Sequence, residues 1–107
     1  MEAREIYAAL FDARGPVGAP SGEWNFIGDD GCFEPERLNR IIVAAIGNPR
    51  AYVAVSRKTA AEMPIGEVAD AVRNFMQQGT VRIADVGLTQ FIEVNPMGVA
   101  RSWSHDA

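Results

Sequence analysis

The chain has 107 residues, a formal net charge of −4 and a single cysteine. A chain of this length is expected to form one domain with its own core, and the lone Cys32 excludes an internal disulfide or a zinc site built on paired thiolates. No segment resembles a membrane span or a secretory signal, so the composition predicts a cytoplasmic protein that does not associate with membranes.

The acidic residues are concentrated in the first third of the chain. Residues 1–36 carry eight acids and two arginines, a net charge of −6, whereas the remainder carries a net charge of +2. No run of the chain forms the basic face that nucleic-acid binding requires, so no nucleic-acid partner is predicted. Two interpretations of the acidic third stay open: it keeps the surface soluble, or it meets a basic partner.

Residues 3–13 have the apolar spacing of an amphipathic helix. Ile6 and Leu10 lie on its apolar stripe, and Tyr7 and Phe11 widen that stripe. The extra width favours either a contact with a second copy of the chain or burial of both rings in the protein's own core.

The next segment, residues 15–22, is rich in glycine and proline and predicts a loop without regular structure. The alternation of Trp24 and Phe26 then predicts a strand over residues 23–27 with one aromatic face. Residues 28–31 predict a turn that leads to a short return strand through Cys32 and Phe33.

The clearest pattern is a helix followed by a strand over residues 35–56. The helix carries one apolar stripe, with Gly47 expected to take positive φ after its last turn and Pro49 preventing its continuation. The strand from Ala51 is apolar on both faces, which is typical of an interior position in a sheet. The stripe consists of Leu38, Ile41, Ile42, Ala45 and Ile46.

The second half of the chain predicts one more helix and three strands. A polar connection over residues 57–62 leads to a helix from Pro64 to Gln78, and a strand follows over 80–86. If the strands at 51–56 and 80–86 are parallel neighbours, their crossover should be right-handed. Residues 88–94 and 99–103 predict an antiparallel hairpin, and residues 104–107 a frayed tail.

Together these elements predict a single α+β domain over residues 1–107. We expect a mixed sheet of four to six strands, three helices packed on it and a C-terminal antiparallel hairpin.

Four carboxylates within eight residues form the densest candidate site: Asp29, Asp30, Glu34 and Glu36. Beside Trp24 they could contact a partner or a ligand, and oxygen ligands suit hard cations. The spacing does not match a calcium loop, and turn chemistry together with the helix dipole accounts for the same residues. No metal and no cofactor are predicted.

Two cations, Arg57 and Lys58, follow the predicted interior strand. They could hold an anion beyond the end of the sheet, or they could be solvated loop charges. The only histidine, His105, lies too close to the chain end for a held general base. Beside Phe33, Cys32 is expected to behave as a small buried hydrophobe.

These patterns support two hypotheses about function. The preferred one is a small non-catalytic accessory protein of bacterial type that acts through protein contacts as a homodimer, with Tyr7 and Phe11 at the dimer contact. The alternative is a small-molecule-binding protein or modest enzyme with a cleft lined by Trp24, Asp30 and Glu34.

Overall fold

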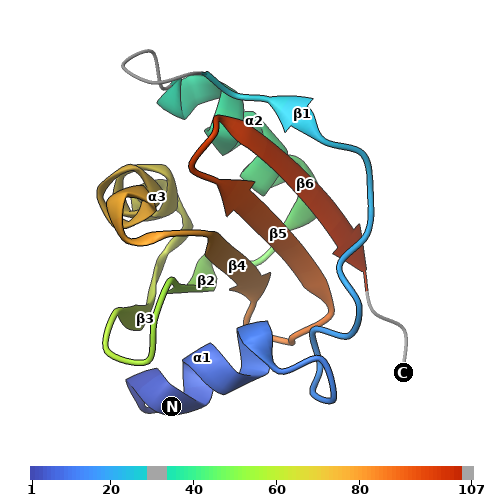
Figure 1. Ribbon diagram of the computed structural model, residues 1–107, viewed down its shortest axis with the longest axis vertical. Coiled ribbons are helices and arrows are strands. Elements are labelled where there is room, and N and C mark those ends of the chain that lie inside the picture. Colours follow the sequence, from blue (N-terminus) through green and yellow to red (C-terminus); the bar gives the residue numbers. More distant parts are fainter. Residues whose placement is uncertain (29–33, 105–107) are drawn as a thin grey trace.

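The computed structural model describes residues 1–28 and 34–104. Its strands β1 (Asn25–Phe26), β2 (Arg50–Ala54), β3 (Ala60–Pro64), β4 (Val81–Asp85), β5 (Gln90–Asn95) and β6 (Val99–Ser104) form one sheet in the order β1-β6-β5-β4-β2-β3. The helices are α1 (Ala3–Phe11), α2 (Pro35–Ala45) and α3 (Val68–Phe75), and 3-10 turns η1 (Ile65–Glu67) and η2 (Met76–Gln78) flank α3. The α+β prediction is therefore confirmed (Figure 1).

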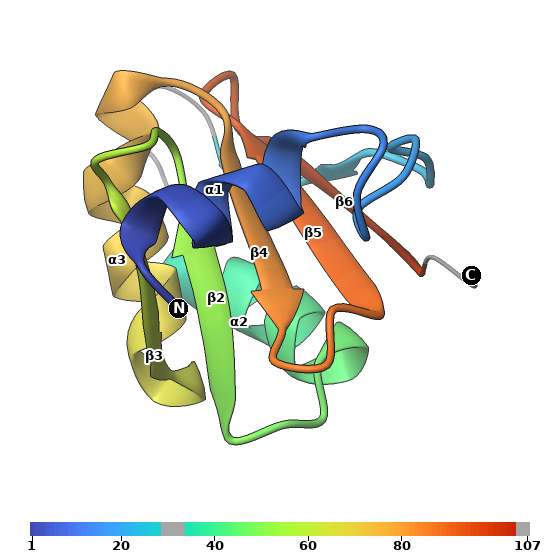
Figure 2. The ribbon, with the colours of Figure 1, turned by 90° about the horizontal axis from the view of Figure 1, so that it is seen from below.

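The sheet lies between two helical layers, with α2 and α3 on one face and α1 on the other (Figure 2). The predicted stripe of α2 faces the sheet, since Leu38, Ile42 and Ile46 are at most 2% exposed. Strand β2 is apolar on both faces, as predicted: Val53 joins the core under α2 and α3, and Ala54 joins the core under α1. Each layer is thus held by burial of apolar side chains.

The direction of the strands differs from the expected mixed sheet, because every pair is antiparallel. The predicted polar connection at 57–62 contains most of β3, which returns alongside β2 and reverses the chain before α3. Strands β2 and β4 are therefore antiparallel neighbours, and no parallel crossover exists between them. Pro64 ends β3 rather than opening the helix, which begins after η1.

Several predicted boundaries also change. The strand expected over 23–27 is limited to β1, and Ser104 is the last residue of β6 rather than part of a tail. Gly47 lacks the expected positive φ, because α2 ends in an extended cap at Ile46. Apart from Gly28, the predicted turn at 28–31 and the return strand through Cys32 and Phe33 lie outside the described residues, as do residues 105–107.

The long loop between α1 and β1 crosses the outer side of β6. Trp103 of β6 donates its indole N–H to the carbonyl of Val17 at 3.0 Å, and both side chains are buried. Further along, Gly22 has φ +92° and runs so close to β6 that a Cβ there would lie 2.4 Å from the carbonyl oxygen of Ser102. Only glycine allows this approach without strain, and it lets the loop cover the β6 edge beyond β1.

Candidate functional site

The aromatic residues of α1 form a stacked pair at the margin of the core. Tyr7 and Phe11 are four residues apart, so they lie on the same face of the helix. Their ring centroids are 4.6 Å apart with an interplanar angle of 18°. Because Ile6 and Leu10 take the buried positions against the sheet, the two rings are only partly buried. The rings thus contact the protein's own core and keep exposed surface, and a contact with a second copy of the chain stays a prediction.

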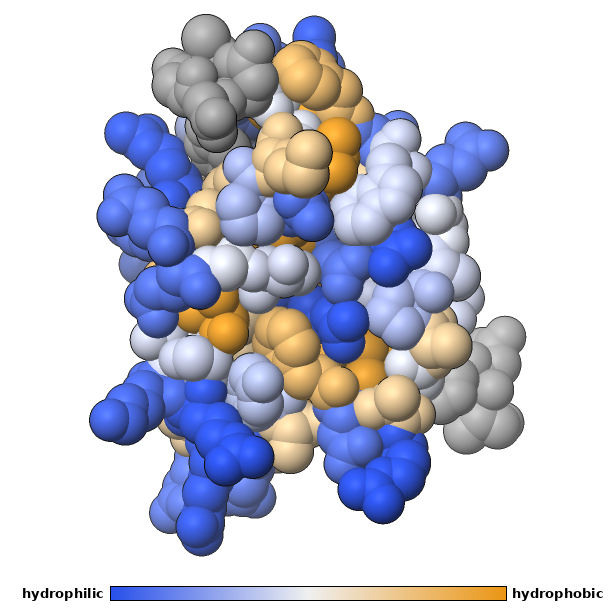
Figure 3. Space-filling view, viewed as in Figure 1, coloured by the Kyte–Doolittle hydropathy of each residue, from blue (hydrophilic) through white to orange (hydrophobic). Residues whose placement is uncertain are grey.

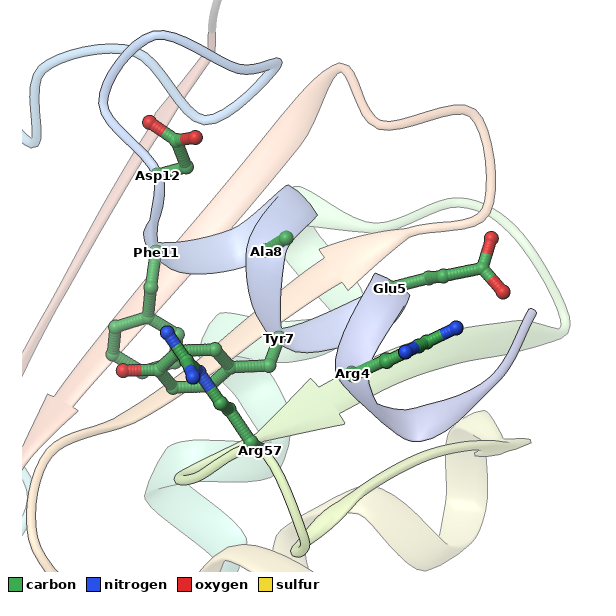
Figure 4. Close-up of a pocket in the computed structure, with 7 residues that line it drawn as sticks. All are labelled: Arg4, Glu5, Tyr7, Ala8, Phe11, Asp12 and Arg57. Atoms are coloured by element: carbon green, nitrogen blue, oxygen red, sulfur yellow. The ribbon is translucent and has the colours of Figure 1, made fainter.

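An open hollow of about 520 Å³, here called the α1 hollow, lies along this aromatic pair. Arg57 reaches it from the turn between β2 and β3, and its guanidinium points toward Tyr7 (Figure 4). The structure therefore brings together two features that the sequence placed in separate candidate sites. The lining residues are Arg4, Glu5, Tyr7, Ala8, Phe11, Asp12 and Arg57.

The rim of the α1 hollow carries charges of both signs. Arg4 contacts Glu2 at 3.4 Å, and Glu5 accepts a hydrogen bond from the backbone N–H of Glu2 at 3.2 Å. The backbone N–H of Arg14 donates to Asp12 at 3.0 Å and lowers the pKa of that carboxyl. Within the described ranges 1–28 and 34–104, Arg57 has no ion pair, so its charge is free to meet a group from outside.

The other predicted site residues do not form one described cleft. Trp24 is 44% exposed and stacks against Arg101, whose guanidinium carbon lies 4.3 Å from the ring centroid. Glu34 precedes α2 and pairs with Arg37 at 2.7 Å, so Trp24 and Glu34 contact different arginines. Asp29 and Asp30 lie outside the described residues, and Lys58 is exposed.

A buried charge cluster on the α1 face of the sheet was not predicted from the sequence. Glu93 of β5 is 6% exposed and lies between Arg82 of β4 and Arg101 of β6, its cross-strand neighbours. One carboxylate oxygen accepts from Arg82 Nε at 3.1 Å and Nη2 at 2.9 Å. The other accepts from Arg101 Nε at 3.0 Å and lies 2.9 Å from Arg101 Nη2. One arginine on each carboxylate oxygen ties the three strands together in this register.

This cluster also holds α1 against the sheet. Arg82 donates a third hydrogen bond to the carbonyl of Leu10 at 2.9 Å, near the end of the helix where carbonyls lack partners. Its guanidinium carbon lies 4.6 Å from the ring centroid of Phe11, which is within the range of a cation–π interaction. Phe11 therefore links the two features, because it lines the α1 hollow and contacts Arg82 of the charge cluster.

A signal for the cluster was present in the sequence. Arg82 stands between Val81 and Ile83, and Glu93 stands between Ile92 and Val94. A single charge inside an otherwise apolar strand must find a partner when the strand is buried on both faces. Charges of opposite sign on consecutive strands therefore indicate a cross-strand pair.

The second buried acid, Asp85, closes the turn between β4 and β5. Its side chain accepts hydrogen bonds from the backbone N–H of Thr89 at 2.7 Å, from that of Gln90 at 3.0 Å and from the Thr89 hydroxyl at 2.8 Å. Burial acts to raise the pKa of Asp85, but these bonds to the carboxylate outweigh it and the pKa is lowered. The turn also contains Leu88 at φ 57°, so Asp85 stabilises a strained backbone.

Replacing Asp85 with asparagine is expected to lower stability at neutral pH by roughly 2 kcal/mol, since bonds to a charged acceptor are replaced by weaker ones. The pKa of Asp85 is lower in the folded protein than in the unfolded chain. Its contribution is therefore complete above the unfolded pKa and disappears as the pH falls through the folded pKa. Urea unfolding between pH 7 and pH 2 should show the difference between the two proteins shrinking toward low pH. A difference independent of pH would contradict this role.

The α1 hollow offers side chains of several chemical kinds. Its side chains supply aromatic surface, guanidinium groups and carboxylates. No cluster of three or more metal-ligating side chains occurs within residues 1–28 and 34–104, and no helix of that part could cross a membrane.

Comparisons of the chain with protein-family models, curated proteins and solved structures found no match. The described residues thus form an α+β fold with an open hollow along α1.

Proposed function

We propose that this protein is a non-catalytic protein-binding protein that acts as a homodimer through the α1 hollow. The observation that carries the proposal is the stacked pair of Tyr7 and Phe11, which keeps exposed aromatic surface beside Arg57. Arg57 has no ion pair in the part of the chain that the structure describes. Aromatic residues and arginine are the types most enriched where proteins meet.

The charges around the hollow support a second copy as the partner. A two-fold contact places one surface patch against the same patch of the other subunit, so the patch must be complementary to itself. Arg4 and Arg57 balance Glu5 and Asp12 here, and each charge can therefore meet one of opposite sign across the axis. A patch with charges of one sign would repel its own copy.

The other exposed apolar residues are weaker candidates for a dimer contact than the α1 hollow. Trp24, Phe26 and Met97 are 44%, 57% and 80% exposed. The face seen in Figure 3 shows hydrophobic residues separated by hydrophilic ones rather than one continuous apolar area. A standard interface covers about 800 Å² of each partner, roughly one eighth of the 5955 Å² surface of this chain, so the contact must extend beyond the hollow itself.

The substitution Ala8→Glu tests the proposal. Ala8 is exposed, lines the hollow and lies within α1, so glutamate adds bulk and charge at the contact without removing a core side chain. Alanine and glutamate are both good helix formers. We expect light scattering to give twice the chain mass of 11.6 kDa for the unaltered protein, and the variant to dimerise at least tenfold more weakly.

The matched control is Ala44→Glu, the same change at an exposed position of α2 on the opposite face of the sheet. It should leave the dimer intact. A monomer mass for the unaltered protein at high micromolar concentration would overturn the proposal, as would equal weakening of the dimer by both variants.

A further inference from the structure

The two edges of the sheet differ in how they are covered. At one edge β1 pairs with the first residues of β6, and the close approach of Gly22 covers β6 at Ser102. At the other edge β3 pairs with β2 alone, and no other strand of the described residues adjoins it (Figure 1). Glu62 and Pro64 of β3 are exposed.

The hydrogen bonds at the ends of the β2–β3 pair show which backbone groups of β3 face outward. The N–H of Val55 donates to Thr59 at 3.0 Å, and the N–H of Ile65 donates to Pro49 at 2.8 Å. Bonded pairs alternate along an antiparallel ladder, so Ala61 and Met63 direct their backbone groups toward β2. The backbone groups of the alternate residues of β3, namely Ala60, Glu62 and Pro64, face away from the sheet.

Pro64 fits this assignment. Proline lacks an N–H and is tolerated in an edge strand where that group would face solvent. The N–H groups of Ala60 and Glu62 therefore remain as outward donors, beside three outward carbonyls. An edge of this kind can accept one more strand through main-chain hydrogen bonds.

The positive charge near β3 indicates which charge the added strand would carry at its end. Lys58 lies just before β3, is exposed and has no ion pair within residues 1–28 and 34–104. Arg57 points instead into the α1 hollow (Figure 4). A strand added antiparallel to β3 runs from Pro64 toward Lys58, so its carboxyl end lies beside the lysine.

We propose that β3 binds an extended segment of a partner protein, added antiparallel to it, whose acidic carboxyl end pairs with Lys58. The side chains of β3 are compatible with close approach of that segment, because Ala60 and Ala61 are small. The site borders the proposed dimer contact, because Arg57 of the same turn lines the α1 hollow, but it uses different groups: the backbone of β3 and Lys58.

One pairing of this edge with a second copy of the chain is disfavoured. A two-fold pairing centred on Glu62 would place the two Glu62 carboxylates opposite each other, and like charges at facing positions are destabilising. A second β3 also turns into η1 at Ile65, so it does not continue as an extended strand past Lys58.

The test is a titration with a synthetic peptide, followed by the backbone amide signals of the protein in NMR. The probe is acetyl-Thr-Val-Thr-Val-Thr-Val-Glu-Asp-Glu with a free carboxyl end, compared with the same peptide ending in Gln-Asn-Gln-amide. We expect the acidic peptide to slow hydrogen exchange at Ala60 and Glu62 at least fivefold, while Ala61 and Met63, already bonded to β2, change little. The neutral peptide should bind at least fivefold more weakly.

Four variants sharpen the test. Lys58→Glu should weaken binding of the acidic peptide at least fivefold, whereas Arg73→Glu, which reverses an exposed charge on α3, should not. Glu62→Pro removes an outward N–H and should abolish binding, while Glu62→Ala keeps that N–H and should bind. If Glu62→Pro fails to fold, Lys58→Glu still decides the question, because it leaves the backbone groups of β3 in place.

Several results would overturn the inference: no exchange protection at Ala60 and Glu62 at millimolar peptide, protection confined to other elements, or equal binding of the two peptides. The dimer variant Ala8→Glu should bind the acidic peptide as the unaltered protein does, and Lys58→Glu should leave the dimer mass unchanged. Failure of one proposal can therefore be distinguished from failure of the other.

Discussion

Replacing Glu93 with alanine is expected to lower the free energy of unfolding by about 3 to 5 kcal/mol, the usual cost of removing one partner from a buried ion pair. The substitution leaves Arg82 and Arg101 without their carboxylate, although their side chains are only 14% and 22% exposed. Arg82 also binds Leu10, so the loss should loosen α1 as well as the three strands. Urea unfolding followed by tryptophan fluorescence measures the change.

The matched control is Glu62→Ala in β3. Glu62 also pairs with an arginine, Arg50, at 2.6 Å, but both side chains are well exposed. An exposed pair contributes about 0 to 1 kcal/mol. Equal destabilisation by the two substitutions would show that burial of Glu93 does not determine its effect.

Replacing Gly22 with alanine is expected to destabilise the protein by roughly 2 to 4 kcal/mol. The backbone at Gly22 has φ +92°, a conformation that costs a residue with a side chain about 1 to 3 kcal/mol. The new Cβ would also lie 2.4 Å from the carbonyl oxygen of Ser102, so the loop must move away from β6. Thermal unfolding followed by circular dichroism should show a lower midpoint.

Gly47 provides the control for this change. It lacks positive φ, and a Cβ there would have no atom within 4 Å. Gly47→Ala should therefore be neutral or stabilise the protein by about 0.4 to 1 kcal/mol, because alanine has fewer unfolded conformations. A loss of stability as large as that of Gly22→Ala would refute the explanation from close approach.

The sequence predicts those parts of the fold in which apolar spacing decides the structure. The stripe containing Leu38 and Ile42 places α2 on the sheet, and the two apolar faces of β2 show that it has neighbours on both sides. Asn95, Pro96 and Gly98 predict the turn of the hairpin between β5 and β6, which the structure confirms.

Strand β3 could not be predicted in the same way. Its residues, Ala60 to Pro64, include no β-branched or aromatic side chain, so local propensity does not favour a strand. Pairing with β2 imposes the extended conformation on them, and this pairing also makes the sheet antiparallel. This pairing depends on β2 and on the turn at 55–59, so the five residues of β3 carry little signal of it by themselves.

The candidate site was predicted only in parts. The spacing of Tyr7 and Phe11 indicated a broad apolar face, and Arg57 stood out as a cation after a buried strand. Their shared hollow depends on the packing of α1 over β2 and β3, which no local pattern reveals. The apolar pattern that predicts the hairpin of β5 and β6 does not indicate a role for Glu93.

The unequal edges of the sheet limit how far it can grow. A strand added at β3 extends the sheet in one direction, and the crossing of Gly22 over Ser102 obstructs growth from the far side. Chains can stack edge to edge into a fibre only if each molecule has two open sheet edges. Among the described residues, β1 at the far edge has only two residues, so β3 is the edge that can pair with a full strand, and the resulting complex stays finite.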